Sequence, residues 1–139
     1  MIELDNQTNL ELNIEIVEKI TNELTSKDIE LLIVSNDEIQ LLNSEHRNKD
    51  KATDVLSFPM EFDFPNMPLG SIVISKEFVE EKAKEYGHST NDEFTLLFIH
   101  GILHLLGFDH EIDNGEHRQK EEELIKKYNL PDSLIIRNS

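Results

Sequence analysis

The pattern of hydrophobic and polar positions in the first part of the chain predicts strands and helices in alternation. Residues 1–5 fit a short strand, and residues 9–25 carry apolar side chains at helical spacing behind an asparagine that can cap a helix. Residues 30–34 are a continuous apolar run, which is typical of a buried strand. A Ser-x-x-Glu capping pattern opens a second helix over residues 35–45. Because each strand is followed by a helix, the first two strands are expected to pair in parallel.

The second part of the chain continues with two strands and then only helices. Residues 55–58 read as a third strand, and the prolines that follow place it at the edge of a sheet. Residues 70–75 predict a fourth strand, and its final serine can cap a helix over 76–86. A further helix is expected over 90–106, opened by a capping pattern at its first residue, and a charged helix over 115–128.

These elements predict an α+β fold made of one domain, residues 1–139. The expected architecture is a mixed four-stranded sheet with about five helices. The helix over 90–106 is apolar nearly all round, which indicates a central, buried helix.

Two histidines interrupt this apolar helix. His100 and His104 are one turn apart, so they project from the same face. Gly107 is a natural end for the helix because glycine accepts the left-handed cap conformation, and the chain can then turn and bring His110 toward the other two. Three imidazoles arranged in this way suit one tetrahedral Zn²⁺ ion whose fourth position stays open to water.

A role as metal ligands explains the histidines better than a role in packing. Burying two imidazoles without partners would cost several kcal/mol, and a metal satisfies both at once. The spacing matches the metzincin pattern H-E-x-x-H-x-x-G-x-x-H, except that Gly101 replaces the general-base glutamate. The sequence therefore predicts a metzincin-like site without peptidase chemistry. Gly101 itself indicates either clearance beside the metal or close helix packing. Asp109 could be a fourth ligand, but the role expected for it is to hold a histidine ring or the loop.

Composition and charge restrict the partners. The chain of 139 residues has no cysteine, so any zinc must be held by imidazole, carboxylate or water. The net charge of −16 argues against nonspecific nucleic-acid binding, although Arg47, Lys49 and Lys51 form one local basic cluster. No apolar run or leader pattern indicates a membrane span or a signal peptide, so we expect a cytoplasmic protein. The other histidines, at positions 46, 88 and 117, are interpreted as surface residues.

At this point the motifs match a known family. The segment 100–110 resembles the H-G-x-L-H-L-x-G-[FY]-D-H signature of the YbeY-type endoribonucleases, bacterial enzymes of ribosomal RNA maturation. Residues 42–59 and 69–74 resemble two further blocks of that family. His46 stands where the family has an aromatic residue, and Ser71 where it has an acidic one.

The resemblance implies a zinc-dependent, single-strand-specific endoribonuclease. It would act in 16S rRNA 3′-end maturation and ribosome quality control, with ribosomal RNA, the small ribosomal subunit and ribosomal proteins or a ribosome-assembly GTPase as partners. The resemblance singles out Arg47 as the functional residue that holds a phosphate, with Lys49 and Ser57 contacting the RNA backbone. The proton acceptor stays open between a metal hydroxide, a second water and the ribose 2′-hydroxyl.

Two other functions remain open. One is a different zinc hydrolase, such as a peptidase that binds an extended peptide along the third strand. The other is a ribosome-associated binding module whose zinc mainly maintains the fold. Incubation with RNA and with unstructured peptide separates the first, and chelation of the metal separates the second.

Overall fold

The computed structural model describes residues 1–60, 67–109 and 111–138. In these residues the chain forms an α+β fold of four strands and six helices, as the sequence predicted apart from one additional helix. The elements in chain order are β1 (Ile2–Asn6), α1 (Glu15–Leu24), β2 (Ile29–Val34), α2 (Asn36–Arg47), β3 (Val55–Pro59), β4 (Gly70–Ser75), α3 (Lys76–Tyr86), α4 (Thr90–Leu105), α5 (Glu116–Lys127) and α6 (Ser133–Asn138).

The four strands form one mixed sheet in the order β1-β2-β4-β3. β1 pairs in parallel with β2, and β2 pairs in parallel with β4, which confirms the predicted pairing of the first two strands. β3 runs antiparallel to β4 at the edge, with Ser57 opposite Ile72. The edge position predicted from the prolines is therefore confirmed.

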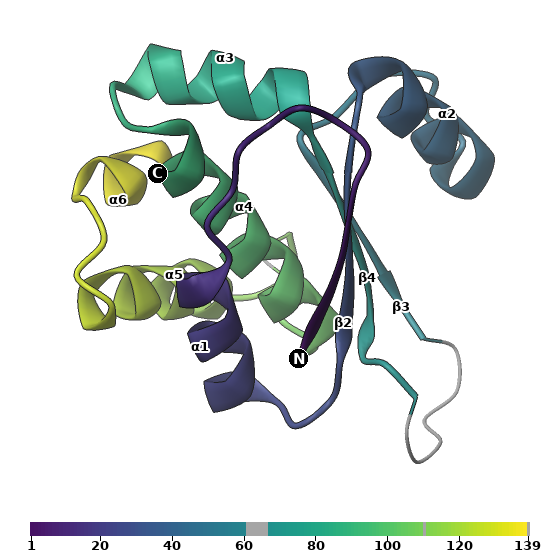
Figure 1. The fold of residues 1–139 in the computed structure, drawn as a ribbon. Helices are drawn as coiled ribbons and strands as arrows, with labels where there is room; N and C mark the ends of the chain where they lie inside the picture. The colour runs from purple at the N-terminus through teal and green to yellow at the C-terminus, as the bar shows by residue number, and fades with distance from the viewer. Residues whose placement is uncertain (61–66, 110, 139) are drawn as a thin grey trace.

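Helices cover the two faces of the sheet unequally (Figure 1). α2 lies on one face, where Ile39 packs against Val73 of β4. The remaining helices lie on the other face, with α4 in the middle of them. Ile72 and Ile74 of β4 pack there against apolar residues of α4 such as Phe98, and all three side chains are fully buried. The central, buried helix expected from the sequence is thus α4.

The helix predicted over residues 9–25 begins later than expected, at Glu15. The preceding residues are held in a turn by side chains that compete with the helical backbone for hydrogen bonds. The Asn6 side chain accepts from the Thr8 amide (3.0 Å) and donates to the Leu10 carbonyl (2.8 Å). Polar side chains before the helix therefore delay its start, although the apolar spacing of the segment is helical.

Two details at the ends of helices also differ from the predictions. Ser89 caps α4 by accepting a hydrogen bond from the Asp92 amide (3.0 Å), so the cap lies one residue before the predicted Thr90. The short helix α6 was not predicted because the segment has little apolar periodicity. It forms against the helical layer, where Leu134 is fully buried.

Candidate functional site

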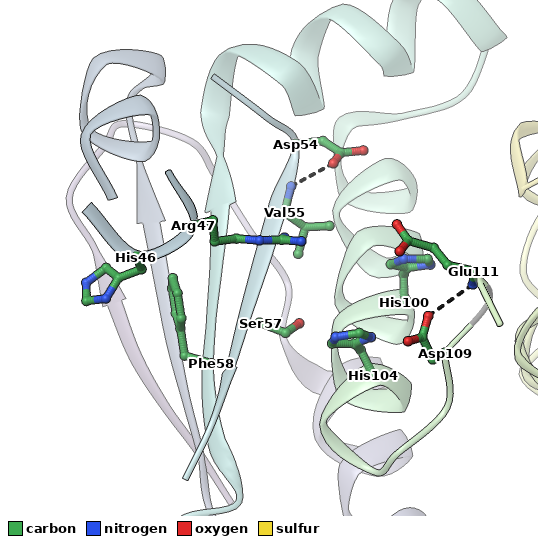
Figure 2. Close-up of a pocket in the computed structure, with 10 residues that line it drawn as sticks. All are labelled: His46, Arg47, Asp54, Val55, Ser57, Phe58, His100, His104, Asp109 and Glu111. Carbon is green, nitrogen blue, oxygen red and sulfur yellow. Dashed lines mark hydrogen bonds between the residues drawn. The ribbon is translucent and has the colours of Figure 1, made fainter. Parts of the chain in front are cut away.

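A cavity of about 630 Å³ lies between the edge strand β3 and the C-terminal half of α4 (Figure 2). α2 and the loop after α4 complete its walls. The side chains that line it are those of His46, Arg47, Asp54, Val55, Ser57, Phe58, His100, His104, Asp109 and Glu111. Five of the residues singled out from the sequence therefore meet at one cavity: Arg47, Ser57, His100, His104 and Asp109.

The last two turns of α4 place the first two predicted metal ligands in the cavity. His100 and His104 both line it, which agrees with their expected position on one helix face. Figure 2 shows the two rings one above the other on the side of α4 that faces β3. The His100 side chain is 31% exposed, so it reaches solvent through the cavity although most of α4 is buried.

The third predicted ligand, His110, lies outside the described residues, and its role stays a prediction. The chain around it does return to the cavity. Gly107 adopts the left-handed conformation (φ 102°) after α4, as expected for a glycine that ends a helix. Asp109 and Glu111 then both line the cavity, and Asp109 Oδ1 accepts a hydrogen bond from the Glu111 amide (3.0 Å).

Gly101 serves close packing of α4 on the sheet. A Cβ atom at this position would lie 3.0 Å from Cγ2 and 3.2 Å from Cδ1 of Ile72, and 3.3 Å from Oγ of Ser57. Ser57 also donates a hydrogen bond to the Gly101 carbonyl (3.2 Å). Of the two interpretations left open by the sequence, the contacts favour tight packing over clearance beside a metal.

Behind the cavity, α5 supplies two buried partners to His100. Glu121 is 1% exposed, and its Oε1 lies 2.6 Å from Nδ1 of His100. His117, one turn earlier on α5, is 0% exposed and stacks on the His100 ring with centroids 4.6 Å apart and planes at 24°. Ligand atoms of these three residues all lie within 4.8 Å of one another, so the group is a candidate metal site.

The interpretation of His117 and His88 as surface residues was therefore wrong. The His88 side chain is 2% exposed, and its ring lies between Ser133 Oγ (3.0 Å) and Glu93 Oε1 (2.8 Å). His46 is exposed, as expected. Each of the two buried rings has a carboxylate partner four or five residues later in the chain, and this partner offsets the cost of burying a polar side chain.

The sequence did contain a signal for the pair on α5. His117 and Glu121 precede Leu124 and Ile125 at helical spacing, and these four are the buried residues of α5. A histidine and a glutamate in line with the apolar face of a helix point to the core and need a buried polar partner there. His100 is that partner.

Burial and neighbouring charges shift two pKa values at the site. Burial lowers the pKa of His104, and the nearby Asp109 carboxylate opposes this shift only in part. Burial raises the pKa of Glu121, but the imidazoles of His100 and His117 together outweigh it, so the pKa lies below its ordinary value. The lowered pKa of His104 favours its neutral form, which is the form that binds metals, and the lowered pKa of Glu121 favours the ionised form, which accepts hydrogen bonds.

The opposite wall carries the predicted substrate residues, and it is more exposed. Arg47 is the last residue of α2, and its side chain extends across the cavity toward α4 in Figure 2. Ser57 lies on β3, in the same wall, with its hydroxyl directed toward α4 in Figure 2. Lys49 is exposed beyond the end of α2 and is not among the residues that line the cavity.

The charge at the cavity is mainly negative. The described lining has three carboxylates (Asp54, Asp109 and Glu111) and one guanidinium, that of Arg47. The local basic cluster expected from the sequence therefore contributes only this arginine. An anionic ligand would need a further positive charge in the cavity, which a bound cation provides.

The donor set fits such a cation. His104 lines the cavity and is exposed there. Nδ1 of His100 lies 2.6 Å from Glu121, so Nε2 is the ring nitrogen that would hold a metal. Imidazole nitrogen is a preferred ligand of Zn²⁺ and of other transition metals.

An α+β fold with histidines of a buried helix at an open cavity is typical of metal-dependent hydrolases. The model of the endoribonuclease YbeY family matches residues 2–129, and the chain belongs to this family. The resemblance drawn from the motifs is thereby confirmed.

Proteins named endoribonuclease YbeY from three bacteria are similar over nearly their whole length. The Aliarcobacter butzleri protein is 69% identical over 140 residues, covering 100% of both chains. The proteins of Nautilia profundicola and Sulfurimonas denitrificans are 62% and 59% identical, each covering 99% of both chains. A protein of Thermotoga maritima solved in solution is 28% identical with a TM-score of 0.57, over 93% of this chain and 92% of that one. Within the described residues, no helix combines the length and apolar character needed to cross a bilayer.

Proposed function

We propose that this chain, residues 1–139, is one metal-dependent endoribonuclease domain that hydrolyses single-stranded RNA. Membership of the endoribonuclease YbeY family supports the activity. The observation that carries the proposal is the pairing of walls in one cavity, with Arg47 on one side and His100 and His104 on the other. This arrangement suits a phosphodiester held between a guanidinium and a metal.

We assign the metal to His100, His104 and His110, with zinc as the proposed ion. When bound, it would activate a water molecule and offset negative charge on the phosphate. The position of His104 at the cavity and the contact between His100 Nδ1 and Glu121 support this assignment. No cysteine is present to fill the remaining position, which agrees with a catalytic rather than a closed structural site.

The chain's own groups hold and orient the RNA. Arg47 can donate two parallel hydrogen bonds to a phosphate and oppose the charge that develops during hydrolysis. The Ser57 hydroxyl would lie beside the phosphate while it donates its hydrogen bond to the Gly101 carbonyl. Lys49, outside the cavity, would meet the RNA backbone farther along the strand.

The acidic body of the protein favours a guided substrate. With a net charge of −16, the chain repels RNA at long range and gains little from nonspecific binding. We therefore propose that ribosomal proteins or a ribosome-assembly GTPase bring it to its RNA in the cytoplasm. The family resemblance makes the 3′ end of 16S rRNA and ribosome quality control the proposed physiological roles.

A comparison of substrates tests the activity. Purified protein with one equivalent of Zn²⁺ is incubated with labelled single-stranded RNA, the same RNA in a duplex, single-stranded DNA of that sequence and an unstructured peptide. We expect cleavage of the single-stranded RNA alone, seen as discrete fragments on a denaturing gel. Cleavage of the peptide, or of no substrate at any metal concentration, would contradict the proposal.

A further inference from the structure

The side of His100 that faces away from the cavity is built as tightly as a protein core. Glu121 Oε1 lies 2.6 Å from His100 Nδ1. His117 covers the His100 ring, and its Nε2 lies 3.0 Å from the same carboxylate oxygen. The Phe108 ring also contacts the His117 ring, with centroids 6.0 Å apart and planes at 61°. Residues of α4, of α5 and of the loop after α4 are therefore packed around the His100–His117 pair.

The distances argue against His117 and Glu121 as metal ligands. Two donors on one tetrahedral Zn²⁺ lie roughly 3.3 Å apart, because each sits about 2.0–2.1 Å from the ion. The Glu121 oxygen is closer than this to both nitrogens, at 2.6 and 3.0 Å. The His100 and His117 rings are also stacked face to face, with planes at 24°, so the two imidazoles contact each other directly. These are the distances of direct contact between the side chains.

We infer that Glu121 is a positioning residue for the metal site: by accepting a hydrogen bond from the Nδ1–H of His100, it fixes the tautomer that leaves the lone pair on Nε2. Neutral imidazole carries its proton on one of two nitrogens, and the hydrogen bond of one decides the state of the other. A buried carboxylate on Nδ1 therefore keeps the lone pair on Nε2 and also orients the ring. His117 supports the arrangement by stacking on His100.

The inference rests on the proposed metal site, and its consequence is a graded effect on metal affinity. Loss of a ligand removes binding, whereas loss of a partner behind a ligand typically lowers affinity about 10- to 100-fold. Glu121→Gln keeps the size of the side chain and removes its charge. We expect this variant to bind one Zn²⁺ with 10- to 100-fold lower affinity, measured by competition with a chromophoric chelator.

The chain offers a matched control. Glu93 is also fully buried and lies 2.8 Å from a histidine, His88, but it is not among the residues that line the cavity. Glu93→Gln removes the same charge from the same kind of buried pair. We expect it to lower the melting temperature as much as Glu121→Gln does, while Zn²⁺ affinity stays within threefold of wild type. Equal losses of Zn²⁺ affinity in the two variants would assign the effect to general destabilisation and overturn the inference.

A third variant separates positioning from ligation. His117→Phe keeps a flat ring on His100 and removes both nitrogens. We expect one Zn²⁺ per chain with affinity within about threefold of wild type, because the Glu121 carboxylate still accepts the hydrogen bond from His100 Nδ1. If His117→Phe or Glu121→Gln abolished Zn²⁺ binding as fully as His104→Ala, the residue would be a ligand, and the inference would be wrong.

Nuclear magnetic resonance tests the inference even without metal. Long-range ¹H–¹⁵N spectra of metal-free protein at pH 8 report which nitrogen of each histidine carries the proton. We expect His100 to show a protonated Nδ1 in the wild type and a mixture of tautomers in Glu121→Ala. A protonated Nε2 in the wild type would refute the inference. This result is independent of the proposed function, which instead fails if the wild type neither binds Zn²⁺ nor cleaves RNA.

Discussion

The two walls of the cavity are built in opposite ways. On the α4 wall, His100 is backed by Glu121 and His117, which are 1% and 0% exposed. On the facing wall, Arg47 and its neighbour His46 are both exposed, at the end of a surface helix. On the α4 wall, His100 is fixed by buried contacts while His104 is exposed at the cavity, and the facing wall presents only exposed side chains at the end of α2.

The difference teaches how the tasks of the site are divided. A metal needs ligands fixed to within a fraction of an ångström, so its wall is part of the core. An RNA strand has variable bases and a flexible backbone, so an exposed arginine that becomes ordered on binding suits it. The α4 wall should therefore govern metal affinity, and the α2–β3 wall should govern only the handling of RNA.

Removal of the metal should have the largest effect. After treatment with a chelator, we expect cleavage of single-stranded RNA to disappear. The fold should persist with a modest decrease in melting temperature, because the buried residues of α4 and the sheet form an apolar core. Circular dichroism melts and a gel assay on the same sample measure both. Loss of the cooperative melting transition would instead show that the ion maintains the fold.

Arg47→Ala should break the other wall alone. We expect the cleavage rate to fall by about 10²–10³, as for the loss of one charge-stabilising donor. Zn²⁺ content and melting temperature should equal those of the wild type, since Arg47 is exposed at the end of its helix. Arg118→Ala, an exposed arginine of α5, is the matched control and should leave the rate unchanged. Equal loss of zinc in Arg47→Ala would contradict the division between the walls.

Gly101→Ala tests the contact that holds the two walls together. The added methyl group would press on Ile72 and Ser57, and overpacking of a core costs about 1–3 kcal/mol. Helix propensity returns about 1 kcal/mol, so we expect net destabilisation by about 1 kcal/mol in urea unfolding. Combining it with Ile72→Val, which removes one crowded atom, should cost less than the sum of the two single changes. An increase in stability would refute the packing interpretation.

A surface pair between α1 and the end of α5 should matter least. Glu23 contacts the Lys127 ammonium and accepts from the Tyr128 hydroxyl (2.8 Å). The hydrogen bond from Lys127, followed by that from Tyr128, lowers the pKa of Glu23 below its ordinary value of 4.5. Because its pKa is lower in the folded state, the ionised Glu23 carboxylate stabilises the fold above pH 4.5. This contribution is lost as the pH falls through the pKa of the folded state.

We therefore expect Glu23→Gln to lower the melting temperature slightly at pH 7, without effect on Zn²⁺ affinity. The difference from wild type should shrink in high salt and vanish in acid, where Glu23 becomes protonated in both states. Thermal melts across pH and salt measure this. A difference that stays constant from neutral pH to pH 3 would contradict the assigned cause.

Local patterns in the sequence predicted most of the fold. The strand Gly70–Ser75 and the helix that ends before Gly87 form where apolar spacing, a capping serine and a glycine agree. The predicted start of α1 was wrong because the Asn6 and Thr8 side chains hold a turn that apolar spacing does not reveal. The helix α6 was not predicted because it is held by packing against residues distant in the sequence.

The site, like the fold, was predictable where it depends on local spacing in the sequence. The spacing of His100 and His104 placed both on one face, since helical geometry is local. Glu121 and His117 were missed because their partner lies on another helix, and spacing within one motif does not report contacts between helices. Their position on the apolar face of α5 did indicate that they are buried. The many charged residues elsewhere on this helix made the apolar face hard to recognise.

Zinc content per chain tests the central claim most directly. It is measured on protein purified without added metal, for the wild type and for alanine variants of His100, His104 and His110, with His46→Ala as the control. We predict about one zinc in the wild type and in the control, and less than about a tenth in each of the other three. Full zinc in His104→Ala or His110→Ala would contradict the account.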